Sequence, residues 1–352
     1  MIKTRLLVVV AAATVFANGA DAQFYKGKTV TMIINYPAGG PSDIEGRIVA
    51  QHLPAHIAGK PTIVVKNVGG GGVIGSNQLG NAAPNGEIIG FFTLDMVSQL
   101  VGNPALRVNY ASFVMIAGVE NPMVVYARKD TPPGLKVATD IMRAEEFKAL
   151  SLNAENSNAI NQALSLDLLG LKYRAIPAYR GLKEVETAIL QNEGQLASTS
   201  LPGWTGSVEP TMGSVVLPLW QIGPSNKDGS YPRSPALPNL PTFEEFYATV
   251  KGGERPTGFT YQVLRASSDP LVAMFRTALM PPKTPSEAVA VMRTAFVELW
   301  KDRGFIRDYA NVVQTEPILL TGEEAQDIVA ALGSVKPEIK AFLVDYSNRL
   351  IK

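Results

Sequence analysis

Short apolar runs alternate with glycine-rich turns and helix-like segments over the first third of the chain. Residues 29–35, 62–65 and 88–93 are rich in β-branched and other apolar side chains and predict strands, whereas residues 44–53 and 74–82 predict helices. Strands that alternate with helical segments are typical of βαβ units. The pattern therefore predicts a parallel sheet covered by helices.

A second α/β unit follows a break in the pattern at Asn121-Pro122. Apolar runs at 114–119 and 123–127 flank this break, which we interpret as the first crossing between two domains. Further predicted strands are 149–152, 174–177, 196–200 and 215–222, and predicted helices are 159–169 and 182–192.

The last third of the chain is predicted to be helical after a loop. Residues 223–241 are rich in proline, serine and glycine and predict a loop that returns to the first domain. Helices are predicted at 269–280, 285–301, 304–310 and 322–350, the last one interrupted near Pro337. We expect a leader (1–22), a discontinuous first domain (23–121 with 240–352) and a second domain (122–239).

The first residues have the composition of a signal peptide. Lys3 and Arg5 precede an apolar stretch, residues 6–16, and Ala20-Asp21-Ala22 resembles a cleavage site. The apolar run, 6–17, is too short to span a bilayer. We expect export to the periplasm and cleavage after Ala22.

Charge and cysteine content exclude several classes of protein. Loss of the leader removes two basic and one acidic residue from totals of 32 and 31, which leaves a balanced charge that argues against nucleic-acid binding. The chain has no cysteine, so neither disulfides nor thiol chemistry is available. We expect a monomer without a cofactor, held together by its hydrophobic core.

Two glycine-rich turns carry the candidate chemistry. The first is the run Tyr36-Pro37-Ala38-Gly39-Gly40-Pro41-Ser42-Asp43, and the second contains glycines 69–72 and leads into Ile74-Gly75-Ser76-Asn77. Adjacent glycines let the backbone approach a ligand, and Ser42 or Asp43 is suited to cap the following helix. Free N–H groups at a helix start favour an anion. The two turns together predict one anion-binding pocket.

A dinucleotide site and a zinc site match parts of the chain less well. Gly70-x-Gly72-x-x-Gly75, with Asp95 about 20 residues later, has the spacing of a dinucleotide fingerprint. This motif belongs to the second strand and helix rather than the first, however, and a run of four glycines makes chance matches easy. His52 and His56 have the spacing of a zinc pair, but Pro54 lies between them and no third ligand is near in sequence.

Nucleophilic chemistry is also poorly supported. Ser42 and Ser76 lack the G-x-S-x-G motif and a nearby base. Arg180 could meet a second carboxylate or lie at the surface, and Trp204 could line a cleft or belong to the core. An exported α/β enzyme, either nucleotide-dependent or a hydrolase, stays as the alternative to a binding protein.

Five motifs occur in the order found in one family. They are YPAGGPSD, NVGGGGVIGSNQLGNAAPNG, AYRG, RSPALPNLPTFEE and PPKTPSEAVAVMRTAF. With them the chain resembles the Bug or TctC-like extracytoplasmic solute receptors of the tripartite tricarboxylate transporter group. The resemblance runs over nearly all of the chain after the leader. It implies a type II periplasmic-binding-protein fold, with two α/β domains joined by crossover segments around a ligand cleft.

The resemblance also implies a set of ligand-binding residues. In the family, the two glycine-rich loops of the first domain hold a ligand carboxylate, partly through water, and three segments of the second domain complete the site. By motif, the first-domain positions are Tyr36, Ala38, Gly39, Gly40, Ser42, Asp43, Gly72, Val73, Ile74, Ser76 and Asn77. The second-domain positions are Asn153, Ser157, Asn158, Tyr179, Ser198, Thr199 and Ser200.

Two departures from the family pattern bear on the ligand. Val68 follows Asn67 where relatives usually have arginine, so a basic residue near the pocket mouth is missing. Thr199-Ser200 stands where relatives commonly carry Asp-Asn, and loss of that aspartate disfavours amino-acid ligands. The resemblance thus implies a receptor that passes a small non-amino mono- or dicarboxylate to membrane transport subunits. A receptor that serves a sensor is a further alternative.

Overall fold

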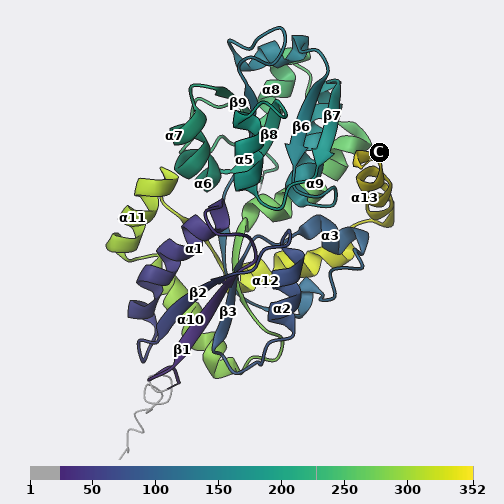
Figure 1. Cartoon of the computed structure of the whole chain (residues 1–352). Helices are drawn as coiled ribbons and strands as arrows, with labels where there is room; N and C mark the ends of the chain where they lie inside the picture. Colours follow the sequence, from purple (N-terminus) through teal and green to yellow (C-terminus); the bar gives the residue numbers. More distant parts are fainter. Residues whose placement is uncertain (1–23, 227, 352) are drawn as a thin grey trace, which may run out of the picture.

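The computed structural model describes residues 24–226 and 228–351, which form two α/β units with one sheet each (Figure 1). The strands of the first sheet are β1 (Thr29–Ile34), β2 (Thr62–Asn67), β3 (Ile88–Phe92), β4 (Val114–Glu120), β10 (Arg276–Met280) and β11 (Ile318–Thr321). Their order across the sheet is β11-β4-β10-β3-β1-β2. β1 pairs in parallel with β2 and β3, whereas β10 runs antiparallel between β3 and β4.

The second sheet contains the strands that lie between the two crossings of the chain. They are β5 (Met123–Arg128), β6 (Phe147–Ser151), β7 (Tyr173–Pro177), β8 (Leu196–Ser200) and β9 (Val216–Ile222). Their order is β7-β6-β8-β5-β9, with β6 parallel to β7 and β8, and β5 antiparallel to β8 and β9. Figure 1 shows this sheet in the upper lobe and the first sheet in the lower lobe.

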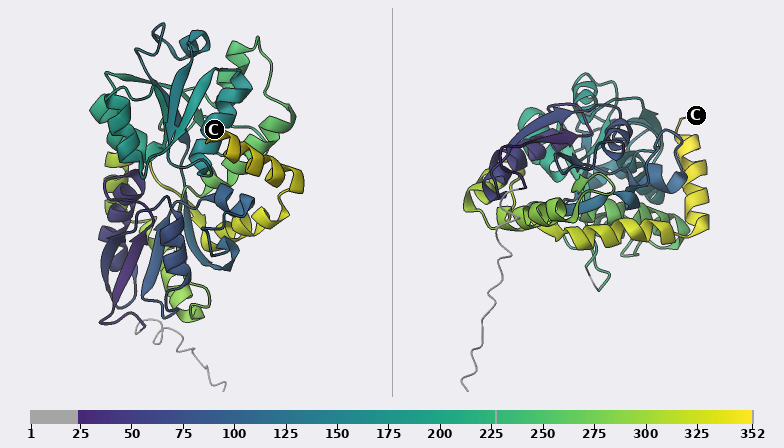
Figure 2. Two further views of the ribbon diagram at one scale, coloured as in Figure 1. Left: turned by 45° about the vertical axis from the view of Figure 1, so that its right-hand side comes forward. Right: turned by 90° about the horizontal axis from the view of Figure 1, so that it is seen from below.

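Helices flank both sheets and also join the two units. Their bounds are α1 (Pro41–His52), α2 (Val73–Gly80), α3 (Met96–Val101), α4 (Ser157–Leu169), α5 (Leu182–Leu190), α6 (Leu201–Gly203), α7 (Glu209–Met212), α8 (Phe243–Val250), α9 (Gly258–Ala273), α10 (Ser286–Leu299), α11 (Arg303–Val313), α12 (Gly322–Ala331) and α13 (Pro337–Leu350). α13 packs on α3 in the first unit and on β7 in the second. In both views of Figure 2, α13 (yellow) lies along one side of the molecule.

Local sequence explains several helix starts. Pro41 occupies the first position of α1, where its fixed φ angle suits a helix and its missing N–H costs nothing. The N-cap of α1 is Gly40, and no side-chain hydrogen bond caps the helix there. The prediction that Ser42 or Asp43 caps this helix is therefore wrong. Thr242 and Thr321 each form a capping box, with Glu245 and Glu324 respectively.

Two further predictions are corrected by the observed elements. Residues 269–280 are not one helix, because α9 ends at Ala273 and β10 begins at Arg276. The sheets are mixed rather than parallel, since β10 and β11 enter the first sheet in the antiparallel sense. The described residues of this loop, 223–226 and 228–241, form no helix or strand, as predicted, and the Gln221 side chain holds the loop through the carbonyl oxygens of Leu237 and Leu240. The domain limits near 121 and 240 stay a prediction.

The hydrophobic core continues from one unit into the other. Met96 and Val97 of α3 belong to the same buried cluster as Ile160 and Ala163 of α4. Trp204 is buried and packs on Tyr126, with ring centroids 5.8 Å apart. It therefore belongs to the core, not to a cleft.

The leader predicted at residues 1–22, with its cleavage site, lies outside the described residues. Within the part of the chain that the structure describes, no helix is long and apolar enough to cross a membrane.

Candidate ligand-binding site

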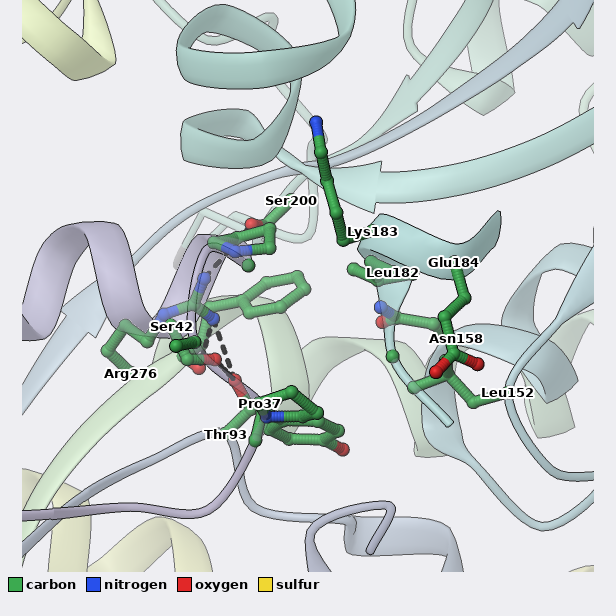
Figure 3. A pocket seen from close by; sticks show the side chains of 16 residues that line it. Pro37, Ser42, Thr93, Leu152, Asn158, Leu182, Lys183, Glu184, Ser200 and Arg276 are labelled. Carbon is green, nitrogen blue, oxygen red and sulfur yellow. Dashed lines mark hydrogen bonds between the residues drawn. The ribbon is translucent and has the colours of Figure 1, made fainter. Parts of the chain in front are cut away.

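A cavity of about 60 Å³ lies between the two units (Figure 3). Its walls come from the first glycine-rich turn, from the ends of β3 and β8, from the start of α5 and from the start of β10. The lining residues are Tyr36, Pro37, Ala38, Gly40, Pro41, Ser42, Thr93, Leu152, Asn158, Gly181, Leu182, Lys183, Glu184, Ser200, Phe275 and Arg276.

The first glycine-rich turn forms the first-unit wall and is fixed by Asp43. Gly39 has a φ of 79°, which favours glycine, and its N–H donates to Oδ2 of Asp43 at 2.9 Å. Arg47 and Asn67 also donate to this carboxylate. Burial opposes ionisation, but these hydrogen bonds lower the pKa of Asp43. Asp43 therefore serves the turn itself and does not line the cavity.

The second glycine-rich turn packs behind Tyr36 and not on the cavity. Gly70, Gly71 and Gly72 all have positive φ angles, and the Tyr36 hydroxyl donates to the Gly71 carbonyl oxygen at 3.4 Å. A Cβ atom on Gly72 would lie 2.9 Å from that hydroxyl oxygen, so glycine is required for this close approach. The hydroxyl of Ser76 donates to the Gly72 carbonyl oxygen at 2.9 Å, which completes the start of α2.

The second unit contributes Asn158, the first residues of α5, and Ser200. Asn158 is 8% exposed, and its buried Oδ1 has no hydrogen-bond partner among the described residues. Gly181, the N-cap of α5, approaches the first turn so closely that a Cβ atom there would lie 3.3 Å from Cγ of Pro37. Glu184 supplies a carboxylate to the lining, but its Oε2 accepts the N–H of Arg180.

Arg276 is a cavity residue that the sequence reasoning missed. It is 1% exposed, and its Nη1 donates to Oγ1 of Thr93 at 2.7 Å while its Nη2 donates to Oγ of Ser200 at 3.1 Å. Its Nε lies 2.6 Å from Oε2 of Glu45, an ion pair whose atoms are close but not aligned as a hydrogen bond. The sequence feature that could have identified Arg276 is its position as a charged residue near the start of the largely apolar run Phe275 to Met280.

The Glu45 carboxylate stabilises the other side of this arginine. Its Oε1 accepts from the Tyr309 hydroxyl at 2.8 Å and from Nδ2 of Asn121 at 3.1 Å. Burial raises the pKa of Glu45, and the positive charge of Arg276 opposes that shift. The pair thus links α1, α11 and the first crossing segment to the cavity wall.

The structure brings some of the predicted site residues onto the cavity and leaves others beside it. Those that line the cavity are Tyr36, Ala38, Gly40, Ser42, Asn158 and Ser200. Those that do not are Gly39, Asp43, Gly72, Val73, Ile74, Ser76, Asn77, Asn153, Ser157, Tyr179, Ser198 and Thr199. Besides Arg276, the sequence reasoning also missed Thr93, which follows β3, and Lys183, in α5.

Asp95 is engaged in the protein and not free to bind a ribose. It is buried, and it accepts from the N–H and hydroxyl of Ser157 and from the N–H and hydroxyl of Ser98. Burial raises its pKa to about 6, and these hydrogen bonds oppose the shift. This geometry argues against the dinucleotide interpretation, which needs a free carboxylate at this position.

Each of the two histidines lies within hydrogen-bond distance of a carboxylate in the first unit. His52 pairs with Asp308 and His56 with Asp302, at 3.0 and 2.8 Å. Among residues 24–226 and 228–351, no group of three or more potential metal ligands is present.

Two α/β units on either side of one cavity, with the chain crossing between them, define the type II periplasmic-binding-protein class. Solved structures agree with this fold. Periplasmic binding protein BugD superposes with a TM-score of 0.67 at 21% identity, covering 93% of this chain and 98% of BugD. A Rhodopseudomonas palustris protein solved with adipate gives 0.70 at 17% identity, covering 90% and 97%. MatC from the same species, solved with malate, gives 0.65 at 17%, covering 91% and 99%.

Sequence relatives point to the same family. A UPF0065 protein of Agrobacterium vitis is 26% identical over 58% of this chain and 61% of its own length. BugT of Bordetella pertussis is 34% identical over 24% of this chain and 26% of its own length. The alignments thus span less than two thirds of either relative, and no family model matches the chain. The resemblance to the Bug and TctC-like solute-binding receptors is confirmed, and the proteins so named are binding proteins rather than enzymes.

Proposed function

We propose that the protein captures a small organic carboxylate in the cavity between its two units and does not transform it. The observation that carries this proposal is the character of the cavity wall, where the start of α1 meets the hydroxyls of Ser42, Thr93 and Ser200 and the guanidinium of Arg276. These groups supply hydrogen-bond donors, and a carboxylate is an acceptor-only group. Malate and adipate, the ligands of two solved neighbours, are both carboxylates.

The end of β8 favours a ligand without an amino group. Thr199 and Ser200 stand there, and neither offers the negative charge that an ammonium group needs. Glu184 is the acidic residue of the lining, and it already accepts the N–H of Arg180. The proposed ligand is therefore a non-amino mono- or dicarboxylate.

The proposal extends to where the protein acts and what receives the ligand. The leader predicts a periplasmic protein that begins at Gln23 after cleavage, and the family resemblance supports delivery to the membrane subunits of a tripartite tricarboxylate-type transporter. Mass spectrometry of protein purified from the periplasm tests the cleavage. A first residue other than Gln23 would refute the predicted site.

A thermal-shift screen of the chain from Gln23 tests binding. It compares mono-, di- and tricarboxylates, aromatic acids, amino acids and nicotinamide nucleotides. A ligand at 100 times its dissociation constant adds about 2.7 kcal/mol to stability, which is readily detected. A shift with one carboxylate class supports the proposal, whereas shifts with nucleotides alone would overturn it.

A further inference from the structure

Four polar side chains form a connected group at the inner end of the cavity, and we call them the Arg276 cluster: Ser42, Thr93, Ser200 and Arg276. All four line the cavity and are at least 92% buried. Figure 3 shows Arg276 between Thr93 and Ser200, with Ser42 beside it. Asn35 fixes the backbone of Thr93, because its amide donates to the Thr93 carbonyl oxygen and accepts the Thr93 N–H.

The cluster holds more hydrogen-bond donors than acceptors. Arg276 donates from Nη1 to Thr93 and to the Phe275 carbonyl oxygen and from Nη2 to Ser200, and its Nε forms an ion pair with Glu45. One Nη2 hydrogen is left without an acceptor in residues 24–226 and 228–351. The Ser200 hydroxyl accepts from this arginine, so its own hydrogen has to point elsewhere, and no described residue accepts it.

The Ser42 and Thr93 hydroxyls lie 3.1 Å apart and share one hydrogen. The two hydroxyls carry two hydrogens, and their mutual bond uses one of them. The other hydrogen is free to reach the cavity, since Thr93 only accepts from Arg276. The cluster therefore offers three donors to whatever enters the cavity. Buried donors need acceptors, and a carboxylate accepts through two oxygens without offering a hydrogen in return.

We propose that Arg276 binds one carboxylate of the ligand through its free Nη2 hydrogen and orients two further donors to it, the hydroxyl of Ser200 and the spare hydroxyl of the Ser42–Thr93 pair. This inference rests on the proposed function and assigns its carboxylate to the Arg276 cluster, not to the second glycine-rich turn. The bound oxygens also join the two units, because Ser200 is the last residue of β8 in the second unit while the other three residues belong to the first unit.

The charge of Arg276 is shared between this carboxylate and Glu45, which lies behind the cavity wall. Replacing Glu45 with glutamine leaves the full charge to the ligand. Glu45→Gln should therefore bind a carboxylate several-fold more tightly, even though the unliganded protein is less stable. A purely structural ion pair predicts lower stability with no gain in affinity, so this variant separates the two roles.

The experiment measures the affinity of the whole mature protein for matched pairs of carboxylate and primary amide: adipate with adipamide, and benzoate with benzamide. The variants are Ser200→Ala, Arg276→Lys and Glu45→Gln. The control is Ser165→Ala, a buried serine of α4 whose hydroxyl donates to the Gln162 carbonyl oxygen. Circular dichroism confirms that each variant folds.

We expect Ser200→Ala to lose on the order of 10- to 100-fold in carboxylate affinity, the effect of one hydrogen bond to a charged group. Arg276→Lys should reduce the preference for carboxylate over amide by a similar factor, and Ser165→Ala should leave it unchanged. Carboxylate affinities within twofold of wild type in both Ser200→Ala and Arg276→Lys would overturn the inference. If wild type binds no carboxylate of the screen, the proposed function itself fails.

Discussion

Replacing Gly181 with threonine should weaken ligand binding without unfolding the protein. Gly181 precedes α5, and its missing side chain faces Pro37 across the cavity, where a Cβ atom would lie 3.3 Å from Cγ and 3.5 Å from Cδ. Its backbone is extended, with φ of −161° and ψ of 158°, so threonine fits without strain and also caps α5. The substitution therefore acts mainly on the contact between the two units.

The structure gives the size of this effect. Carbon atoms pack at about 3.5–4.0 Å, so the new Cβ is a few tenths of an ångström too close to Pro37, and the threonine methyl adds to the overlap. Extra groups in packed sites cost roughly 1–3 kcal/mol. The described structure already has this contact, so the cost falls on this closed arrangement of the two units. If the ligand binds the closed arrangement and the unliganded protein opens, affinity falls on the order of 5- to 150-fold.

Isothermal titration calorimetry and thermal unfolding test this reasoning. Gly333→Thr is the matched control, because a Cβ atom at Gly333 meets no atom within 4 Å. We expect a raised Kd in Gly181→Thr alone and a Tm of the unliganded protein close to wild type in both variants. An unchanged Kd in Gly181→Thr would show that the contact between Gly181 and Pro37 does not change when the ligand binds, and this would refute closure of the two units at this point.

Three further substitutions have defined expectations. Gly39→Val should abolish binding with little change in Tm. Valine is strained at a φ of 79° by roughly 1–2 kcal/mol, but no atom lies within 4 Å of its Cβ position. Retained affinity would count against the first turn as a binding element. The raised pKa of Asp95, about 6 against 3.8, stabilises the folded protein below about pH 4, and this stabilisation is lost as pH rises through 6. Urea unfolding of wild type relative to Asp95→Asn should therefore show a loss on the order of 3 kcal/mol between pH 4 and 7, and a flat or rising difference would mean that the hydrogen bonds outweigh burial. Trp204→Ala should lower the free energy of unfolding by about 3–5 kcal/mol, and a changed Kd at full stability would instead place Trp204 in the cleft.

Local patterns in the sequence were sufficient to predict most elements of the fold. The predicted strand at 196–200 matches β8, and the helices predicted at 285–301, 304–310 and 322–350, with the break near Pro337, correspond to α10, α11, α12 and α13. These elements are bounded by polar turns, glycines or prolines, so their ends are visible in the chain. The first glycine-rich turn was identified in the same way.

The segment 269–280 was misassigned because it contains no such boundary. Apolar residues continue from the end of α9 into β10, and no glycine or proline separates the two elements after Pro270. A short buried strand and a buried helix turn have similar composition, so periodicity cannot distinguish them. Only the pairing of β10 with β3 and β4 determines its conformation.

The same misassignment hid Arg276. Thr93 and Arg276 are 183 residues apart in the chain and 2.7 Å apart in space. In an open α/β sheet, ligands bind at the carboxyl ends of the parallel strands, and β1 and β3 both end at the cavity. Sequence reasoning therefore searches the carboxyl ends of strands, where Tyr36 and Ser200 lie, and does not find a residue that begins a strand.

An antiparallel strand reverses that rule. Thr277 of β10 pairs with Phe92 of β3, so Arg276, the first residue of β10, lies beside Thr93, which follows the last residue of β3. The start of an inserted antiparallel strand thus reaches the same edge as the ends of its parallel neighbours. A charged residue at the start of such a strand is buried beside the cavity, where it needs both an internal counter-ion and polar neighbours. Glu45, Thr93 and Ser200 satisfy that need here, and this explains how one arginine late in the chain connects both units to the proposed ligand.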